Sequence, residues 1–186
     1  MSIESNLVLY HCNDEKRCSR FVNSDKYMIV SHEDGSWLGQ GMYFWDNLGN
    51  AKYWMGEKRR KEPSQKYEIV KARVSMEQLL DLTDIEVCEA LQKLWDECEQ
   101  KMNLPKGEKA ELGLKLNTLC RNIEMFNNAY HVYKVFGKYN RTPKIRFITY
   151  DLTSDKVEPI LSIKTIYNVK KHEAILEKAI VEEKKI

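Results

Sequence analysis

The sequence lacks several features that would define a class of protein at once. Its longest apolar runs fall short of the roughly 20 residues needed to cross a bilayer. Its first residues, MSIESNLVLYH, have neither the basic region nor the long apolar stretch of a signal peptide. The five cysteines are an odd number without a CxxC pair, and the histidines show no metal-ligand spacing. We therefore expect a reduced, cytoplasmic protein with no membrane segment and no metal site.

A strong excess of one charge is also missing. The 186 residues include 30 Lys and Arg against 28 Asp and Glu, a formal net charge of +2. This balance does not by itself indicate a nucleic-acid partner. Hydrophobic residues make up 42% and charged residues 31% of the chain, which suits a globular core. The composition argues against a disulfide-stapled scaffold and against wholesale disorder, and it predicts a single domain over residues 1–186.

Segments typical of strands at both ends of the chain enclose a helical middle. The segments predicted as strands are residues 7–12, 27–31, 66–75, 144–150 and 160–167. The segments predicted as helices are residues 14–22, a stretch beginning at Asp46-Asn47, residues 84–102 and 108–126, and a charged tail from about residue 171. Residues 130–136 fit either a strand or a continuing helix. Because strands and helices do not alternate regularly, we predict an α+β fold with a helical insert at about residues 84–126.

The most unusual segment is WLGQGMYFWDNLGNAKYW, residues 37–54. Gly39 and Gly41 flank Gln40, and aromatic residues surround them. Glycines beside aromatics suit a flat heteroaromatic ring that stacks on a side chain while backbone amides bind its polar edge. The alternative is a hairpin corner packed by aromatic side chains. His11, at the end of an apolar run, is likewise either a satisfied core residue or a neutral imidazole at the mouth of a site.

Taken together, these two segments resemble the ADP-ribosyltransferase fold of the poly(ADP-ribose) polymerase and diphtheria-toxin branch. That branch has a histidine after its first strand, matched by Tyr10-His11, and a tyrosine within Gly-x-Gly-x-Tyr-Phe, matched by residues 39–44. Its next helix supplies an alanine and an aromatic, matched by Ala51 and by Tyr53 or Trp54. The string from Ser31 to Trp45 is also similar to small bacterial proteins of the same superfamily. The resemblance implies a split β-sheet core.

The resemblance also implies a set of residues that bind NAD as a substrate. His11 would hydrogen-bond a ribose or the adenosine-diphosphate portion, and the backbone at Cys12, where the family usually has glycine, would hold the nicotinamide amide. Tyr43 would stack on the nicotinamide, with Trp54 or Tyr53 on its other face. The full implied set is Tyr10, His11, Cys12, Ser31, Gly39, Gly41, Tyr43, Phe44, Tyr53 and Trp54.

The third catalytic residue is left open between two positions. The branch normally has a glutamate, or another polar residue, near the start of a late strand, which residues 160–167 match. Aligning the apolar pattern puts Lys164 there, a cation where a positively charged oxocarbenium-like state must be stabilised. Glu158, just before the strand, would take this role if the register shifts; otherwise it is a solvated turn carboxylate. Glu68 is a further candidate. The implied catalytic residues are thus His11 and Tyr43, with Glu158 or Lys164.

The implied function is that of an NAD-dependent mono-ADP-ribosyltransferase, a glycosyltransferase that modifies a macromolecular acceptor. The acceptor would be protein, DNA or RNA, and the setting a toxin or phage conflict, with an antitoxin protein as a partner. Basic residues at 57–62 and 138–146 favour nucleic acid, unless they are ordinary solvated charge. Two alternatives remain open: a degenerate fold that binds NAD or ADP-ribose without transfer, and a protein-interaction module that uses the helical insert.

Overall fold

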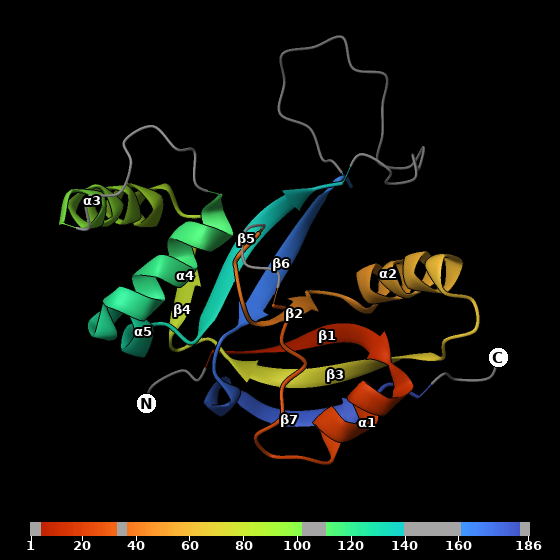
Figure 1. Cartoon of the computed structure of the whole chain (residues 1–186). Helices are drawn as coiled ribbons and strands as arrows, with labels where there is room; N and C mark the ends of the chain where they lie inside the picture. The colour runs from red at the N-terminus through yellow and green to blue at the C-terminus, as the bar shows by residue number, and fades with distance from the viewer. Residues whose placement is uncertain (1–4, 33–36, 102–110, 140–160, 183–186) are drawn as a thin grey trace, which may run out of the picture.

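The computed structural model describes residues 5–32, 37–101, 111–139 and 161–182. The fold is α+β, as predicted: a mostly antiparallel seven-stranded sheet with five α-helices among the described residues (Figure 1). The strand order is β4-β5-β6-β2-β1-β3-β7. The strands are β1 (Asn6–Asp14), β2 (Met42–Trp45), β3 (Tyr67–Ser75), β4 (Leu79–Asp81), β5 (Val132–Lys138), β6 (Ile163–Val169) and β7 (Ile175–Ile180). Among these described strands, only β4 and β5 pair in parallel.

The sheet is narrowly connected at its centre. β1 pairs with β3 along its whole length, from Asn6 opposite Ser75 to Asp14 opposite Tyr67. By contrast, β1 and β2 share the single paired position Tyr10–Trp45. The sheet therefore has two halves, β4-β5-β6-β2 and β1-β3-β7, whose strands run in clearly different directions in Figure 1. Past that pair, the described residues of β1 and β2 do not pair with each other.

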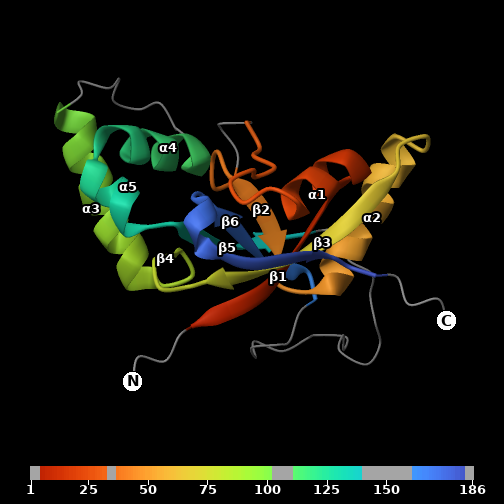
Figure 2. The same ribbon diagram turned by 90° about the horizontal axis from the view of Figure 1, so that it is seen from below.

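The helices gather at the two ends of the sheet (Figure 2). At one end lie α1 (Glu15–Val22) and α2 (Leu48–Lys61); at the other lie α3 (Ile85–Lys101), α4 (Leu112–Asn122) and α5 (Glu124–Ala129). Asp14 caps α1 by accepting a hydrogen bond from the Arg17 amide at 2.9 Å, and Asn47 caps α2 through the Asn50 amide at 2.8 Å. Both helices therefore begin at the positions that the sequence predicts.

Three apolar clusters fill the space between the sheet and the helices. The largest joins Phe21 of α1 to Leu9 of β1 and to Val70 and Val74 of β3. A second, on α2, joins Ala51 and Met55 to Cys12 and Ile69, on the other face of β1 and β3. The third belongs to the helical insert and contains Leu38, Leu80, Trp95, Cys98, Leu116, Leu119, Phe126 and Tyr133. Leu38 thus anchors the aromatic segment in the core of the insert.

The structure corrects several of the predicted elements. The charged tail is not a helix: a short 3₁₀ turn at His172–Ala174 leads into β7, whose pairing with β3 satisfies backbone groups that would otherwise form an open sheet edge. Residues 27–31 form no strand beyond an isolated bridge between Ser31 and Gly41. The helix predicted over 108–126 is interrupted at Ile123, which is extended and packs into the third cluster. Of residues 130–136, those from Val132 onward belong to strand β5, and the strand predicted at 144–150 lies outside the described residues.

Candidate functional site

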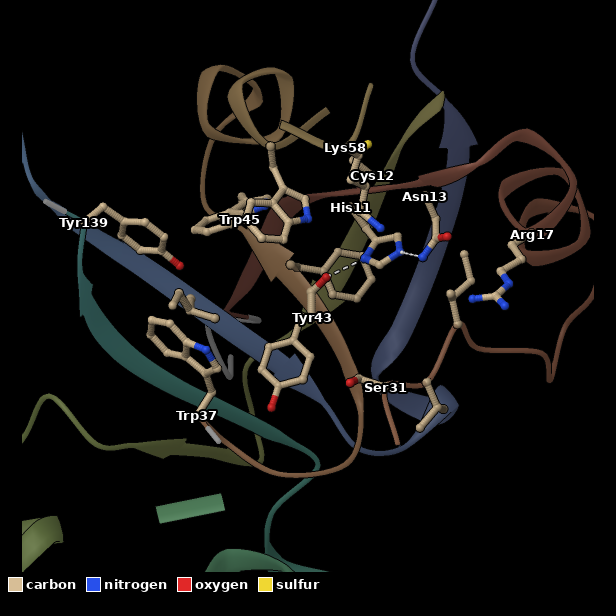
Figure 3. A pocket seen from close by; sticks show the side chains of 15 residues that line it. His11, Cys12, Asn13, Arg17, Ser31, Trp37, Tyr43, Trp45, Lys58 and Tyr139 are labelled. Atoms are coloured by element: carbon tan, nitrogen blue, oxygen red, sulfur yellow. Dashed lines mark hydrogen bonds between the residues drawn. The ribbon is translucent and has the colours of Figure 1, made fainter. Parts of the chain in front are cut away.

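A cavity of about 660 Å³ opens where β1 and β2 separate (Figure 3). Its size falls within the range typical of small-molecule sites. The side chains that line it come from β1, α1, the segment before β2, β2 itself, α2, the residue after β5 and the middle of β6. They are His11, Cys12, Asn13, Arg17, Ile29, Val30, Ser31, Trp37, Tyr43, Phe44, Trp45, Trp54, Lys58, Tyr139 and Ile166.

His11 lies at the centre of this cavity and is only 9% exposed. Its Nδ1 is 2.6 Å from the backbone oxygen of Tyr43, and because a carbonyl only accepts, Nδ1 carries the hydrogen and donates it. Nε2 then accepts from the side-chain amide of Asn13 at 3.2 Å. Burial, opposed by the hydrogen bond to the Tyr43 carbonyl and aided by the nearby Lys58 ammonium, lowers the pKa of His11 to about 4. His11 is therefore a neutral imidazole that bridges the two halves of the sheet.

Tyr43 presents its ring to the cavity and uses its hydroxyl elsewhere. The hydroxyl donates to the Gly39 carbonyl at 2.5 Å and accepts from the Leu38 amide at 3.1 Å. The ring is thereby fixed between the sheet and the loop of residues 38–41, hereafter the glycine loop. Because the hydroxyl is bound to the chain's own backbone, the aromatic face is what Tyr43 offers to a ligand.

The two glycines are required by the chain's own packing. Gly39 has φ +73°, and a Cβ there would lie 2.7 Å from the Gly113 backbone oxygen and overlap the side chain of Asn117. Gly41 has φ +149°, and a Cβ there would lie 2.9 Å from the Val169 backbone oxygen and overlap the side chain of Asn168. Neither glycine lines the cavity. Their conformations let buried asparagines approach the backbone, so they shape the cavity wall indirectly.

Side chains from distant parts of the chain hold the glycine loop. Asn117 of α4 accepts from the Gln40 amide at 3.1 Å, and Asn168 of β6, fully buried, donates to the Gly39 carbonyl at 3.0 Å. Lys170 donates from Nζ to the Leu38 carbonyl at 2.7 Å and also to the Gln40 carbonyl. Burial lowers the pKa of Lys170 to about 8. The loop is fixed by these bonds both to the sheet and to the helical insert.

An aromatic wall faces His11 from the side of this loop. Trp37 stacks on Tyr139 with ring centroids 5.9 Å apart and planes 13° apart. Tyr139 in turn meets Trp45 edge-on at 5.6 Å, and Trp45 contacts Trp54 at 6.3 Å. Trp37 has φ +58°, a left-handed conformation that is strained for a bulky side chain and is found disproportionately at binding sites. The wall offers stacking surfaces to a flat ligand.

The opposite side of the cavity is polar and positively charged. Figure 3 shows Asn13 and Arg17 on the far side of His11 from Trp37 and Tyr139. Arg17 of α1 is the cation on this side, and Lys58 of α2, one helical turn from Trp54, is the other cation among the described lining residues, none of which is a carboxylate. Burial raises the pKa of the Cys12 thiol to about 11, so this cysteine stays protonated and is a poor nucleophile. The site can therefore bind an anionic, partly aromatic ligand.

The structure brings together part of the residue set predicted from the sequence. His11, Cys12, Ser31, Tyr43, Phe44 and Trp54 line the cavity, whereas Tyr10, Gly39, Gly41 and Tyr53 do not. Lys164 lies two residues before Ile166 on the same face of β6 but does not reach the lining, and Glu158 lies outside the described residues. Glu68 lines a separate hollow with Glu15 and Arg59.

Several lining residues carried signals that sequence reasoning missed. Asn13 is two residues after His11 on the same strand, so it points to the same face. Lys58 is four residues after Trp54 on α2 and lies on the same face of the helix, although the basic run of residues 57–62 that contains it is typical of solvated charge. Tyr139 gave no local signal, because only the pairing of β5 with β6 brings it to the cavity.

Comparison with known proteins finds one informative relative. The chain is 30% identical over 129 residues to the uncharacterized protein MJ0359 of Methanocaldococcus jannaschii. The match covers 66% of this chain and 60% of the archaeal protein, so the chain spans less than two thirds of that relative's length. No family model matches the chain. No solved structure matches it either.

Two further features of the described residues bear on the site. No described helix is both long and apolar enough to cross a membrane. In the same part of the chain, no three His, Cys, Asp or Glu side chains gather where they could hold a metal ion.

Proposed function

We propose that this cavity binds NAD and that the protein is an ADP-ribosyltransferase-like enzyme that transfers ADP-ribose to a macromolecular acceptor. The observation that carries the proposal is the meeting of His11 and Tyr43, 32 residues apart in the sequence, through the 2.6 Å bond between Nδ1 and the Tyr43 carbonyl. These are the residues by which the sequence resembles that superfamily. The narrow junction between β1 and β2 further supports a split-sheet core.

The distribution of chemistry in the cavity also supports a dinucleotide. The aromatic wall and the ring of Tyr43 suit the nicotinamide, which is flat. Arg17 and Lys58 suit the pyrophosphate, which is anionic. Neutral His11 lies between them, where a ribose would fall, and Asn13 holds its ring in place at 3.2 Å. NAD carries these three chemical parts in this order.

The reaction would need little covalent help from the protein. The bond between the ribose C1 and the nicotinamide nitrogen breaks, and its electron pair neutralises the positive charge of the ring. A lone pair of the acceptor forms the new bond to C1, and the acceptor's proton passes to water. The ribose is oxocarbenium-like at the transition state, so the chain contributes mainly by clamping the ring and orienting the ribose. The neutral state of His11 avoids adding a positive charge beside that centre.

A second candidate is a protein that binds NAD or ADP-ribose without transferring it. The observation in its favour is that no described residue lining the cavity is a carboxylate. A carboxylate would stabilise the oxocarbenium and orient the acceptor, and Glu158, the sequence's candidate, lies outside the described residues. Any toxin or phage-conflict role, and any antitoxin, rests on the family resemblance alone.

The test is incubation of the purified protein with NAD, with mass spectrometry of free nicotinamide and of adducts on lysate protein, DNA and RNA. A parallel melting experiment measures stabilisation by NAD. We expect nicotinamide release that is lost in Tyr43→Ala. Tyr43→Phe separates the ring from the hydroxyl, because it keeps the stacking face but leaves the Leu38 amide and the Gly39 carbonyl without this partner.

Lys58→Ala and Lys61→Ala form a matched pair on α2, because only Lys58 reaches the cavity. We expect Lys58→Ala to weaken NAD binding about tenfold, the scale of one charge-assisted contact, and Lys61→Ala to leave it unchanged. Stabilisation by NAD without nicotinamide release would establish the second candidate instead. If NAD neither raises the melting temperature nor releases nicotinamide, both candidates are wrong.

A further inference from the structure

A second hollow, of about 550 Å³, continues from the cavity along α1. Arg17, Ile29 and Val30 line both spaces, so the two meet at those residues. We call the second space the α1 groove. Its lining residues are Lys16, Arg17, Arg20, Tyr27, Met28, Ile29, Val30 and His32.

One side of the α1 groove is a row of cations on the exposed face of a single helix. Lys16 and Arg20 are one helical turn apart, with Arg17 beside them. Arg17 pairs with Asp14, its Nε 3.3 Å from the carboxylate, whereas neither Lys16 nor Arg20 takes part in an ion pair among the described residues. No carboxylate is among the described residues that line the groove. In a chain with a net charge of only +2, this is a local concentration of positive charge.

The other side of the groove is aromatic and apolar. Tyr27 and Met28 are half-buried and Ile29 is buried, so they form a floor rather than a free surface. The Arg20 guanidinium lies 4.1 Å from the centroid of the Tyr27 ring, which fixes the ring beside the cations. A row of cations next to an aromatic and apolar floor matches a polymer with an anionic backbone and flat bases. An acidic peptide would use the cations, but it would need aromatic residues spaced among its carboxylates to cover the floor, whereas every nucleotide carries both a phosphate and a base.

We propose that the α1 groove binds a single-stranded nucleic acid, and that this strand is the acceptor of ADP-ribose. The acceptor role rests on the proposed function. The strand would lie along α1 with its phosphates on Lys16 and Arg20 and enter the cavity beside Arg17, where the two spaces meet. There a nitrogen or oxygen lone pair of the strand forms the bond to the ribose C1 of NAD. Nicotinamide leaves with the electrons of the broken bond, and the strand's proton passes to water.

The first measurement is binding of a labelled oligonucleotide of about 12 nucleotides, as DNA and as RNA, by fluorescence anisotropy without NAD. The double variant Lys16→Glu/Arg20→Glu should bind at least about tenfold more weakly. Lys93→Glu/Lys101→Glu makes the same change of charge on exposed α3 and should bind as the wild type does. With Lys16→Gln/Arg20→Gln, the slope of log affinity against log salt should fall by about 1.4, the value for two lost phosphate contacts on a single strand.

The second measurement separates this inference from the proposed function. Lys16 and Arg20 lie outside the cavity, so Lys16→Glu/Arg20→Glu should keep the rise in melting temperature on adding NAD while losing the ADP-ribose adduct on the oligonucleotide. If NAD stabilisation falls as well, the groove belongs to the NAD site and the inference is wrong. It is also wrong if oligoglutamate of equal charge binds as tightly as the oligonucleotide, or if adducts form only on protein. Oligonucleotide binding that depends on Lys16 and Arg20 without any nicotinamide release would support the groove as a nucleic-acid site and refute the transferase.

Discussion

The two sides of the cavity use their polar side chains in opposite ways. On the loop side, Asn117, Asn168 and Lys170 hydrogen-bond to backbone groups of residues 38–40. By contrast, Arg17 of α1 and Lys58 of α2 reach the cavity as cations, and of these two only Arg17 forms an ion pair among the described residues, its Nε 3.3 Å from the Asp14 carboxylate. The difference separates residues that build a wall from residues that can meet a ligand. Polar side chains bonded to the backbone of the glycine loop shape the cavity, whereas the cations that reach it are placed to contact an anionic ligand.

The largest effect should come from the loop side, where Gly41→Ala should destabilise the fold by at least about 3 kcal/mol. The added Cβ would overlap the Asn168 side chain, lie 2.9 Å from the Val169 backbone oxygen and hold a φ of +149° that alanine rarely adopts. Neither neighbour can move away, because Asn168 is fully buried and Val169 pairs within the sheet. Urea unfolding measures the change.

Gly56→Ala is the matched control for this prediction. Gly56 lies within α2, and a Cβ there would meet nothing within 4 Å. Alanine is the better helix former, so this variant should gain about 0.5–1 kcal/mol. If Gly41→Ala is as stable as Gly56→Ala, the loop is not held as tightly as its hydrogen bonds imply.

The next effect concerns His11, which joins the two sides. Its pKa is lowered to about 4 in the fold, against about 6.5 in the unfolded chain, so the unfolded state binds more protons between these values. The part of the folding stability that comes from this pKa difference should therefore be fully present above pH 6.5 and be lost as the pH falls toward 4. Integrated over that range, the loss amounts to about 3 kcal/mol relative to His11→Gln, which does not titrate.

Urea unfolding of the wild type and His11→Gln at several pH values tests this. Other groups titrate in both proteins, so only the difference between the two curves is assigned to His11. Parallel curves from pH 7 to pH 4 would mean that His11 is as hydrated in the fold as in the unfolded chain. The same experiment on His131→Gln serves as a comparison, since burial lowers the pKa of His131 as well, away from the cavity.

The sequence predicts the side of the site built from local segments better than the side built by long-range pairing. His11 follows a strand-like run, and Tyr43 and Trp54 lie in one aromatic segment, so a local pattern indicates all three. Asn168 comes opposite Tyr43 only through the register of β2 with β6, which no local pattern determines. The tail is predicted as a helix for the same reason, because pairing with the exposed edge of β3, which no local pattern determines, decides its conformation.

The smallest effect should come from Lys164, which belongs to neither side. Its position on β6 is opposite Gly137, on the face that carries Ile166, yet it stops short of the cavity lining. The apolar pattern of its strand predicts this cation at the reacting ribose, where it would oppose the positively charged transition state. From its place in the structure, we expect Lys164→Ala to change NAD affinity and nicotinamide release by less than about twofold and stability by no more than about 0.5 kcal/mol. Parallel measurements on Lys58→Ala calibrate the assay, because that lysine does line the cavity. A marked gain in release on Lys164→Ala would move this lysine into the site and extend the cationic side of the cavity to β6.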